Sequence, residues 1–191
     1  MTDGGFAMLR HQGTRMLETP RLLLRRFTPD DAVPMFCNWA NDAEVCRFLS
    51  WEPHGTLGMT QAMLARFIAA YEDEAVYHWV MELKQLGQPI GSLSVIDASD
   101  ANLRCEIGYC MGKPWWGQGL MSEAVQAMIR YLMHDVGYNR VYAHHDVQNP
   151  GSGRVMEKAG MRFEGIERQR YARDDGFSDG KLWAMIREDC E

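Results

Sequence analysis

Residues 106–124 read EIGYCMGKPWWGQGLMSEA, which has the pattern of a strand, a glycine-rich turn and the start of a helix. Glycines let the backbone turn sharply and approach a ligand closely. The unpaired amides of the first helical turn can then point at a single anion. The pattern therefore predicts a phosphate-binding turn, and a pyrophosphate would suit it.

The turn matches neither common nucleotide-binding motif. A dinucleotide fingerprint would need glycine in place of Ser122, and a P-loop would need Lys followed by Ser or Thr where Leu120 and Met121 stand. After the turn, an apolar stripe predicts a helix that ends at Gly137. The stripe has spacings of four and three residues and consists of Met121, Val125, Met128 and Leu132.

The segments around the turn predict a mixed α/β domain. Upstream strands are expected at residues 21–27, from residue 77, at 90–96 and at 103–111. Upstream helices are expected from Thr28, over 43–49 and around 63–71. Downstream, we expect a strand over 140–147, a helix that opens at Asn149-Pro150, and a hairpin of strands 161–171 and 177–187 joined by Asp174-Asp175-Gly176.

The length and composition are those of one globular domain. With 191 residues, of which 46% are hydrophobic and 24% charged, the chain can build a real core and is not predicted to be disordered. We expect a single domain over residues 17–189, preceded by an N-terminal extension of residues 1–16. No apolar run is long enough to cross a bilayer and no signal peptide is recognisable, so a cytoplasmic protein without membrane contact is expected.

The charge and the cysteines exclude several classes of function. A formal net charge of −6 argues against a nucleic-acid partner, which would need clustered Lys and Arg. The five cysteines contain no Cys-x-x-Cys pair, so neither a disulfide framework nor a zinc site is predicted. His144, His145 and Asp146 are consecutive on a predicted strand and lack metal-ligand spacing, so a structural histidine is favoured there. No metal is expected.

Four short motifs, together with the order of the elements, carry a family resemblance. They are Thr19-Pro20-Arg21-Leu22, Glu106-Ile107-Gly108-Tyr109, Trp116-Gly117-Gln118-Gly119 with Ser122-Glu123-Ala124, and Asn149-Pro150-Gly151-Ser152 leading to Glu157-Lys158-Ala159-Gly160. From roughly Leu17 to Asp189, the chain resembles the GCN5-related N-acetyltransferase (GNAT) superfamily, and within it the ribosomal-protein alanine and serine N-acetyltransferases. The resemblance implies the acyl-CoA N-acyltransferase fold, in which helices flank a mostly antiparallel, twisted central sheet that is splayed in the middle.

The resemblance implies acetyl-CoA as co-substrate, with its pyrophosphate on the backbone amides of the turn. By motif position these amides belong to Trp116, Gly117, Gln118, Gly119, Leu120 and Met121. The family's turn usually begins with Arg or Gln where this chain has Pro114, which removes a side-chain contact and lowers the expected affinity. The thioester is expected in the gap between the strands that end near Met111 and Val147. There, the backbone of Tyr109, Cys110 and Met111 would polarise the acetyl carbonyl.

The resemblance also implies direct attack of a neutral amine on the thioester. Glu106 is the candidate base, acting through a water, and an ion pair with Arg104 or Arg140 is the alternative. Ser152 is the candidate proton donor to the departing thiolate, and Asn149 is a CoA-contacting cap. The alternative for both is simple helix capping.

Two further residues lie where the family binds its substrates. Nothing beside Cys110 in the sequence would activate its thiol, so packing is favoured there over nucleophilic catalysis. Trp51 follows the first helices, where the family builds its acceptor pocket, and it is the candidate wall of that pocket. Ordinary surface packing is the alternative for Trp51.

The ease of deprotonation favours one class of acceptor. At neutral pH an α-amine costs about 1 kcal/mol to deprotonate, whereas a lysine side chain costs roughly 4 to 5 kcal/mol. Since the sequence offers one candidate carboxylate and no base dyad, a protein or peptide N-terminus is the favoured acceptor. A small-molecule amine such as a polyamine, amino acid or antibiotic, a non-catalytic acyl-CoA-binding module, and another nucleotide-dependent enzyme are the alternatives. The final hairpin is a possible homodimer edge.

Overall fold

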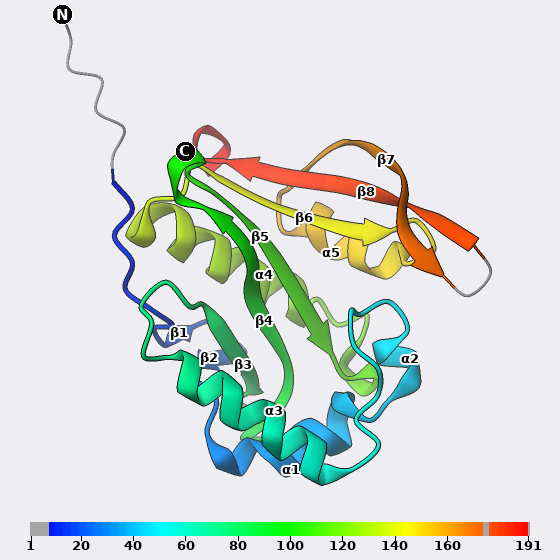
Figure 1. The fold of residues 1–191 in the computed structure, drawn as a ribbon. Helices are drawn as coiled ribbons and strands as arrows, with labels where there is room; N and C mark the ends of the chain where they lie inside the picture. The colour runs from blue at the N-terminus through cyan, green and yellow to red at the C-terminus, as the bar shows by residue number, and fades with distance from the viewer. Residues whose placement is uncertain (1–7, 174–175, 191) are drawn as a thin grey trace, which may run out of the picture.

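The computed structural model describes residues 8–173 and 176–190. In these ranges eight strands form one sheet in the order β1-β2-β3-β4-β5-β6-β8-β7 (Figure 1). The strands are β1 (Leu17–Glu18), β2 (Leu22–Arg25), β3 (His78–Leu83), β4 (Gln88–Ser99), β5 (Arg104–Met111), β6 (Arg140–Asp146), β7 (Arg162–Arg173) and β8 (Gly176–Ile186). Neighbours pair antiparallel except β5 and β6, which pair parallel. The mixed α/β fold with a mostly antiparallel sheet is thus confirmed. Residues 174 and 175 of the predicted hairpin turn lie outside the described ranges.

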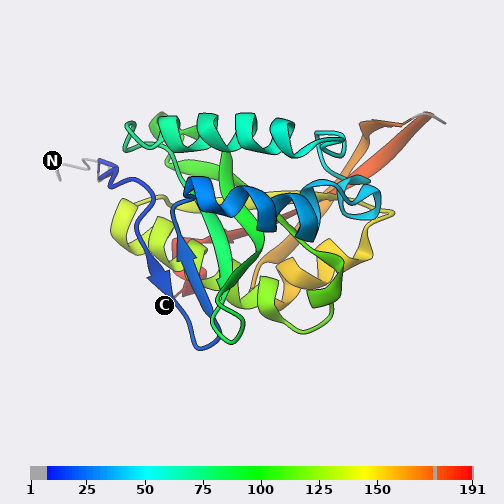
Figure 2. The same cartoon turned by 90° about the horizontal axis from the view of Figure 1, so that it is seen from below.

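Helices lie on both faces of the sheet. They are α1 (Ala32–Met35), α2 (Ala43–Cys46), α3 (Leu57–Ala70), α4 (Leu120–Arg130) and α5 (Pro150–Lys158). Shorter helical turns are η1 (Pro29–Asp31), η2 (Phe36–Ala40), η3 (Asp100–Asn102), η4 (Lys113–Trp115), η5 (Tyr131–Val136) and η6 (Arg187–Cys190). Figure 2 shows α1 and α3 on one face and α4 and α5 on the other. None of the helices in the described ranges has the length and apolar character needed to span a membrane.

The helix expected from Thr28 is broken into three short pieces. A 3₁₀ turn (η1) leads into α1, which is followed by a π-helical turn (η2). Pro34 lies inside α1 and has no amide to donate to the carbonyl four residues earlier, which agrees with the 3₁₀ turn before α1 but does not explain the π-helical turn after it. The predicted apolar face is nevertheless buried, because Met35 and Trp39 both belong to the core.

The central helix has the predicted design. Met121, Val125, Met128 and Leu132 are all buried against the sheet. The π-helical turn η5 continues α4 as far as Gly137, whose φ of +110° lies in the left-handed region that favours glycine. The apolar stripe and its stop signal therefore fix where this helix sits and where it ends.

The sheet is splayed in its middle, as the resemblance implies. β5 and β6 pair only through Arg104 with Arg140, Cys105 with Val141 and Glu106 with Tyr142. Beyond Glu106, β5 stays paired with β4, while β6 stays paired with β8. A gap therefore opens between the carboxyl-terminal halves of β5 and β6, and one edge of β5 faces it.

Residues 8–16 of the predicted N-terminal extension are hydrogen-bonded to the body of the protein. The Arg10 amide donates to the Val136 carbonyl at 2.8 Å, and the Gly13 amide donates to the Glu74 carbonyl at 2.8 Å. The indole nitrogen of Trp79 donates to the Arg15 carbonyl at 2.6 Å. The described part of this segment thus lies on the domain, and the boundary at residue 17 stays a prediction.

Candidate active site

The glycine-rich turn has the backbone geometry that anion binding requires. Gly117 and Gly119 have φ values of +76° and +75°, and Gly119 is the N-cap of α4. A Cβ at Gly117 would meet nothing within 4 Å, so the space beside the turn is open. The amides of residues 117–119 donate to no protein acceptor in the described ranges, and the first amides of α4 have no partner within the helix, whereas the Trp116 amide, which was also predicted to bind phosphate, donates to the Lys113 carbonyl at 3.1 Å. The turn can therefore offer these amides to a phosphate.

The Thr-Pro-Arg-Leu motif of residues 19–22 holds this turn from outside. The Arg21 side chain donates through Nε to Glu123 Oε2 at 2.6 Å and through a terminal nitrogen to the Gln118 carbonyl at 2.9 Å. The Thr19 hydroxyl donates to Glu123 Oε1 at 2.6 Å. Burial alone would raise the pKa of Glu123, but these hydrogen bonds lower it. The ionised carboxylate therefore ties β2 to the first turn of α4.

A cavity of about 380 Å³, here called the α4 cavity, opens beside the turn between β5, α4 and α5. It is lined by predicted cofactor-contacting residues: Tyr109, Cys110, Met111, Trp116, Gly117, Gly119, Met121, Asn149 and Ser152. Gln118 and Leu120 are absent from its lining. The Gln118 side chain donates to the Pro114 carbonyl at 3.0 Å, and Leu120 is buried in the core. These two residues can contribute only their backbone amides.

Two cations in the α4 cavity were not predicted from the sequence. Arg154 and Lys158 of α5 both line it, and none of its described lining residues is acidic. The pair gives the cavity a positive charge that suits the phosphates of CoA. The signal was present in the sequence, because the two residues are four apart on the helix that opens at Asn149 and so share one face.

A larger cavity of about 770 Å³, here called the α3 cavity, covers the opposite face of the sheet. Its floor includes Ser92, Ser94 and Gly108 of β4 and β5. One side, the polar wall, consists of Glu106, His144 and Arg170, and the other, the apolar wall, consists of Trp51, Met63 and Phe67. The α3 and α4 cavities share six lining residues: Phe48, Leu49, Tyr109, Cys110, Asn149 and Ser152. The cavities therefore meet at the gap in the sheet.

Glu106 has one oxygen held and the other open. His144 Nδ1 lies 2.8 Å from Oε1, and a terminal nitrogen of Arg170 lies 3.5 Å from the same oxygen. Among the described residues none forms a hydrogen bond with Oε2. No ion pair with Arg104 or Arg140 is found in the described ranges, and Arg140 pairs with Glu164 instead. A carboxylate fixed at one oxygen and open at the other can accept a proton from the cavity.

His144 links Glu106 to a second carboxylate. Its Nε2 lies 3.1 Å from Glu167 Oε1, and only 5% of its side chain is exposed. Because both ring nitrogens face carboxylate oxygens, neither is open to the substrate, and His144 serves to orient Glu106. Sequence reasoning placed His144 on a strand without a partner. The partner comes from the parallel pairing of Glu106 with Tyr142, since His144 lies two residues further along the same face.

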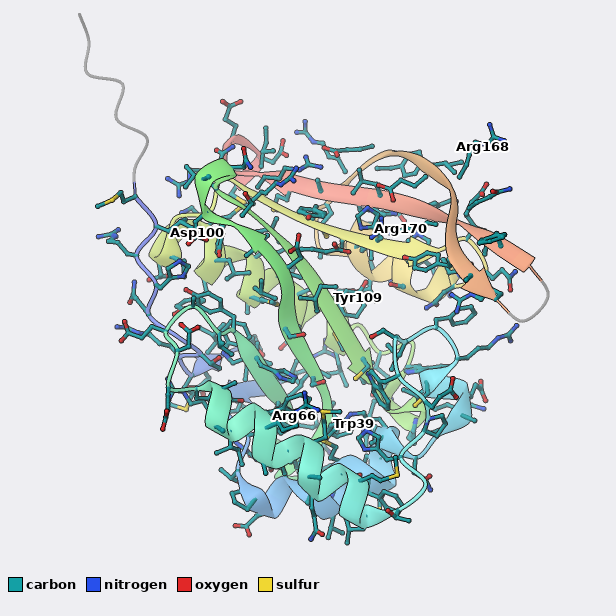
Figure 3. The ribbon with its side chains drawn as sticks, viewed as in Figure 1. Trp39, Arg66, Asp100, Tyr109, Arg168 and Arg170 are labelled. Atoms are coloured by element: carbon teal, nitrogen blue, oxygen red, sulfur yellow. The ribbon has the colours of Figure 1, made fainter. Side chains whose placement is uncertain are left out.

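A bulge in β7 brings Arg170 to the polar wall. Between the pairs Glu167 with Gly180 and Tyr171 with Ser178, β7 has more residues than β8, and Gln169 has a φ of +54°. Arg170 also pairs with Glu167, and Figure 3 shows it over the sheet near β6. A Cβ at Gly180 would lie 2.5 Å from Arg170 Cδ, so a side chain at residue 180 would displace Arg170 from this position. No sequence signal for this bulge was recognised.

Tyr109 and Ser152 form a hydroxyl pair where the cavities meet. Tyr109 Oη lies 2.9 Å from Ser152 Oγ and 3.1 Å from the Ser152 carbonyl oxygen. Burial raises the pKa of Tyr109, so the phenol keeps its proton. Asn149 Oδ1 accepts from the Ser152 amide at 3.3 Å, so Asn149 does cap α5. The Ser152 hydroxyl takes no part in that cap.

The remaining predicted residues also lie at the cavities. Burial raises the pKa of the Cys110 thiol, whose sulfur lies 3.3 Å from the Ser92 hydroxyl, so a thiolate nucleophile is not supported. Trp51 lines the α3 cavity with its ring 5.1 Å from that of His54. In the described ranges no group of three His, Cys, Asp or Glu residues could hold a metal ion.

The comparisons with known proteins agree with this geometry. The model of the acetyltransferase (GNAT) domain family matches residues 21–162. The chain belongs to the GNAT acetyltransferase family. These enzymes use acetyl-CoA as co-substrate, and the α4 cavity offers the amides, the cations and the open space that this molecule needs.

Individual relatives share the family at moderate identity. The Bacillus subtilis (strain 168) protein named uncharacterized N-acetyltransferase YoaA is 28% identical over 172 residues, which cover 90% of this chain and 97% of that protein. The Escherichia coli (strain K12) ribosomal protein uS5-alanine N-acetyltransferase is 33% identical over 85 residues, or 44% of each chain. The crystal structure of a GCN5-related N-acetyltransferase from Brucella melitensis superposes with a TM-score of 0.82 at 19% identity, covering 97% of this chain and 84% of that one. The chain is therefore an N-acetyltransferase.

Proposed function

We propose that this enzyme transfers the acetyl group of acetyl-CoA directly to a primary amine, the α-amine of a protein or peptide N-terminus. The observation that carries the proposal is the meeting of two cavities at Tyr109, Cys110 and Ser152. One cavity is basic and lies beside the anion-binding turn, and the other contains a carboxylate with an open oxygen. An acyl donor and an amine can thus approach each other from opposite faces of the sheet.

Glu106 takes the proton of the amine through a water. Its Oε1 is held by His144, while Oε2 is open to the α3 cavity, in which the amine would lie. As the amine loses its proton, its nitrogen forms a bond to the acetyl carbon. A single carboxylate suffices for an α-amine, whose deprotonation at neutral pH costs about 1 kcal/mol.

The free edge of β5 supports the oxyanion. Successive amides of a strand point to opposite sides, and the Gly112 amide at the end of β5 donates to the Ile90 carbonyl of β4. The amides of Tyr109 and Met111 therefore face the gap. The Trp116 indole nitrogen donates to the Met111 carbonyl at 2.7 Å, which agrees with this orientation. Such preorganised donors stabilise the charge that develops on the acetyl oxygen.

The hydroxyl pair supplies the second proton. As the carbon–sulfur bond breaks, Ser152 Oγ gives its proton to the thiolate and takes one from Tyr109 Oη, 2.9 Å away. The burial that raises the pKa of Tyr109 keeps this reserve proton in place at neutral pH. Glu106 then releases its proton to water and the tyrosinate left behind regains one from water, so both groups return to their starting states before the next turnover.

The choice of a protein or peptide acceptor rests on two supports. The first is the presence of one open carboxylate rather than a base dyad, which suits an α-amine better than a lysine side chain. The second is the similarity to an enzyme named for acetylation of a ribosomal protein. A small-molecule amine is the alternative acceptor.

The test is a thiol-release assay with acetyl-CoA against peptides with free N-termini, the same peptides blocked at the N-terminus, and small amines. We expect release with the free peptides only, and a loss of at least tenfold in kcat for Ser152→Ala and Tyr109→Phe. Release with small amines alone would favour the alternative acceptor. Thermal protection by acetyl-CoA without release on any amine would favour a non-catalytic module.

A further inference from the structure

Helix α3 presents apolar side chains to two different surroundings. Leu64 is buried in the core, as expected for one face of an amphipathic helix. Met63 and Phe67, four residues apart, are only half-buried and line the α3 cavity instead. Phe67 packs against the core with part of its ring, Met63 does not belong to that cluster, and both leave hydrophobic surface in a concave site of the kind that ligands cover.

Phe67 of the apolar wall is held between two other rings, neither of which is charged. The Phe67 ring stands edge-on to the His78 ring at 4.2 Å and lies 5.7 Å from the Phe27 ring. Burial lowers the pKa of His78 to about 4, so this imidazole carries no charge at neutral pH. A ligand group that packs against Phe67 therefore meets a fixed aromatic surface rather than a solvated one.

The register of the sheet places this wall within side-chain reach of the acetyl site. His78 of β3 pairs with Ser94 of β4, which pairs with Gly108 of β5, so the three residues form one row across the strands. Two strand spacings separate Gly108 from His78, or about 10 Å. Ser94 and Gly108 are the small residues of that row, and the Ile96 side chain lies over Gly108, with its Cγ2 3.1 Å from where a Cβ of residue 108 would be, so it adds apolar surface to the floor.

The two walls differ in chemistry across this short floor. Glu106, with its open oxygen, lies two residues from Gly108 on β5 and belongs to the polar wall. Phe67 lies on the other side of Ser94, against His78 of β3, and Met63 is one turn before it on α3. A molecule whose amine is next to Glu106 and whose substituent extends over Ser94 would reach the apolar wall.

We propose that the preferred acceptor is an amine with a large apolar or aromatic group within side-chain reach, such as an N-terminus whose first residue is Phe, Leu or Met. The group packs against Met63 and Phe67. This inference rests on the proposed function and specifies its substrate class. Covering apolar surface in a preformed pocket discriminates by roughly tenfold or more for each well-packed methylene.

The experiment measures kcat/KM by thiol release for peptides that differ only in their first residue, Phe, Leu, Ala or Asp, and for 2-phenylethylamine against ethylamine. Met63→Ala is compared with Met59→Ala, the same truncation one turn earlier on α3, where the side chain is 52% exposed. We expect Phe and Leu peptides to exceed the Ala peptide at least tenfold. We also expect Met63→Ala to reduce that ratio at least fivefold and Met59→Ala to leave it unchanged.

The outcomes separate this inference from the proposed function. Equal rates for the Phe and Ala peptides, or equal effects of the two methionine variants, would overturn the apolar preference and leave peptide acetylation intact. If the peptides are inert but 2-phenylethylamine exceeds ethylamine at least tenfold, the apolar preference holds and the peptide assignment fails. If no amine releases thiol, both fail.

Discussion

The α4 and α3 cavities are built by different means. The part of the α4 cavity proposed to hold the phosphates is one continuous stretch, the turn and the first residues of α4, and its binding groups are backbone amides, while β5, α5 and residues 45–49 line the rest. The α3 cavity draws side chains from segments between residues 35 and 173, and its binding groups are carboxylates, cations and aromatic rings. A site made of local backbone is specified by local sequence, whereas a site made of side chains depends on the whole fold.

The largest predicted effect is that of Glu106→Gln, which should impair catalysis in the α3 cavity and leave acetyl-CoA binding in the α4 cavity unchanged. Glu106→Gln removes the base but keeps the shape of the side chain, so we expect kcat to fall about 100-fold or more. The α4 cavity contains no part of Glu106, so the Kd for acetyl-CoA should stay within about twofold, consistent with independent sites. Thiol release and calorimetric titration measure the two quantities. A variant with unchanged kcat would exclude Glu106 as the base.

The second prediction concerns the ionised groups around the α3 cavity. Buried Asp146 accepts from Ser178 Oγ at 2.6 Å, from Arg173 Nε at 2.9 Å and from the Gln148 amide at 2.9 Å. Burial alone would raise the pKa of Asp146, but these bonds lower it. Removing the charge leaves Arg173 without its partner, so Asp146→Asn should cost about 2 to 3 kcal/mol of stability at pH 7.

The pH dependence follows from the direction of that pKa shift. Because the pKa of Asp146 is lower in the folded state, its ionised form stabilises the fold above the unfolded value near 3.9, and the contribution is lost as pH falls through the folded value. Urea unfolding at pH 7 and at successive lower values should show the difference between wild type and Asp146→Asn shrinking below about pH 4. Exposed Asp135→Asn is the control, with an effect within about 0.5 kcal/mol. A difference independent of pH would contradict this account.

The third prediction tests the backbone of the turn. A β-branched residue at φ +76° costs about 1 to 2 kcal/mol, so in Gly117→Val the free turn should relax to a different backbone conformation. Restoring the binding conformation would cost that energy, and we therefore expect acetyl-CoA to bind roughly tenfold more weakly. Gly87→Val is a matched control, since its φ is +61° and a Cβ there also meets nothing within 4 Å. Gly87 lines neither cavity, so that variant should lose similar stability and keep its acetyl-CoA affinity. Equal affinities for the two variants would argue against the turn as the phosphate site.

The smallest effect concerns the support of the turn. Arg21→Ala removes the contacts with Glu123 and the Gln118 carbonyl, and since the Arg21 side chain is 46% exposed we expect the KM for acetyl-CoA to rise about threefold. Arg162→Ala, which removes the ion pair with Asp189 away from the turn, is the control and should leave this KM unchanged. A KM unaffected by Arg21→Ala would show that the turn holds its shape without β2.

The same contrast explains how much of the fold was predictable from the sequence. The turn, α4 and its stop at Gly137 follow from glycine positions and apolar spacing, which act within a few residues. The splayed sheet and the identity of the site residues came from family resemblance. The break in the first helix was missed because Pro34 was not weighed against the apolar stripe around it.

The residues missed at the site are those placed by tertiary structure. His144 is adjacent to Glu106 only because β5 and β6 pair in parallel, and Arg170 reaches the polar wall only through a bulge at a non-glycine residue of positive φ. Neither the strand pairing nor the bulge produces a pattern that can be recognised in the local sequence. Arg154 and Lys158 were the exception, since their helical spacing was readable and was overlooked.

The most direct test of this account is the crystal structure of the protein with acetyl-CoA. We expect the pyrophosphate oxygens within about 3.2 Å of the amides of residues 117–121, and the thioester in the gap between β5 and β6, beside Tyr109 and Ser152. The acetyl group should then lie where the α4 and α3 cavities meet. Phosphates bound away from the turn, or a thioester that does not reach the gap, would contradict the account.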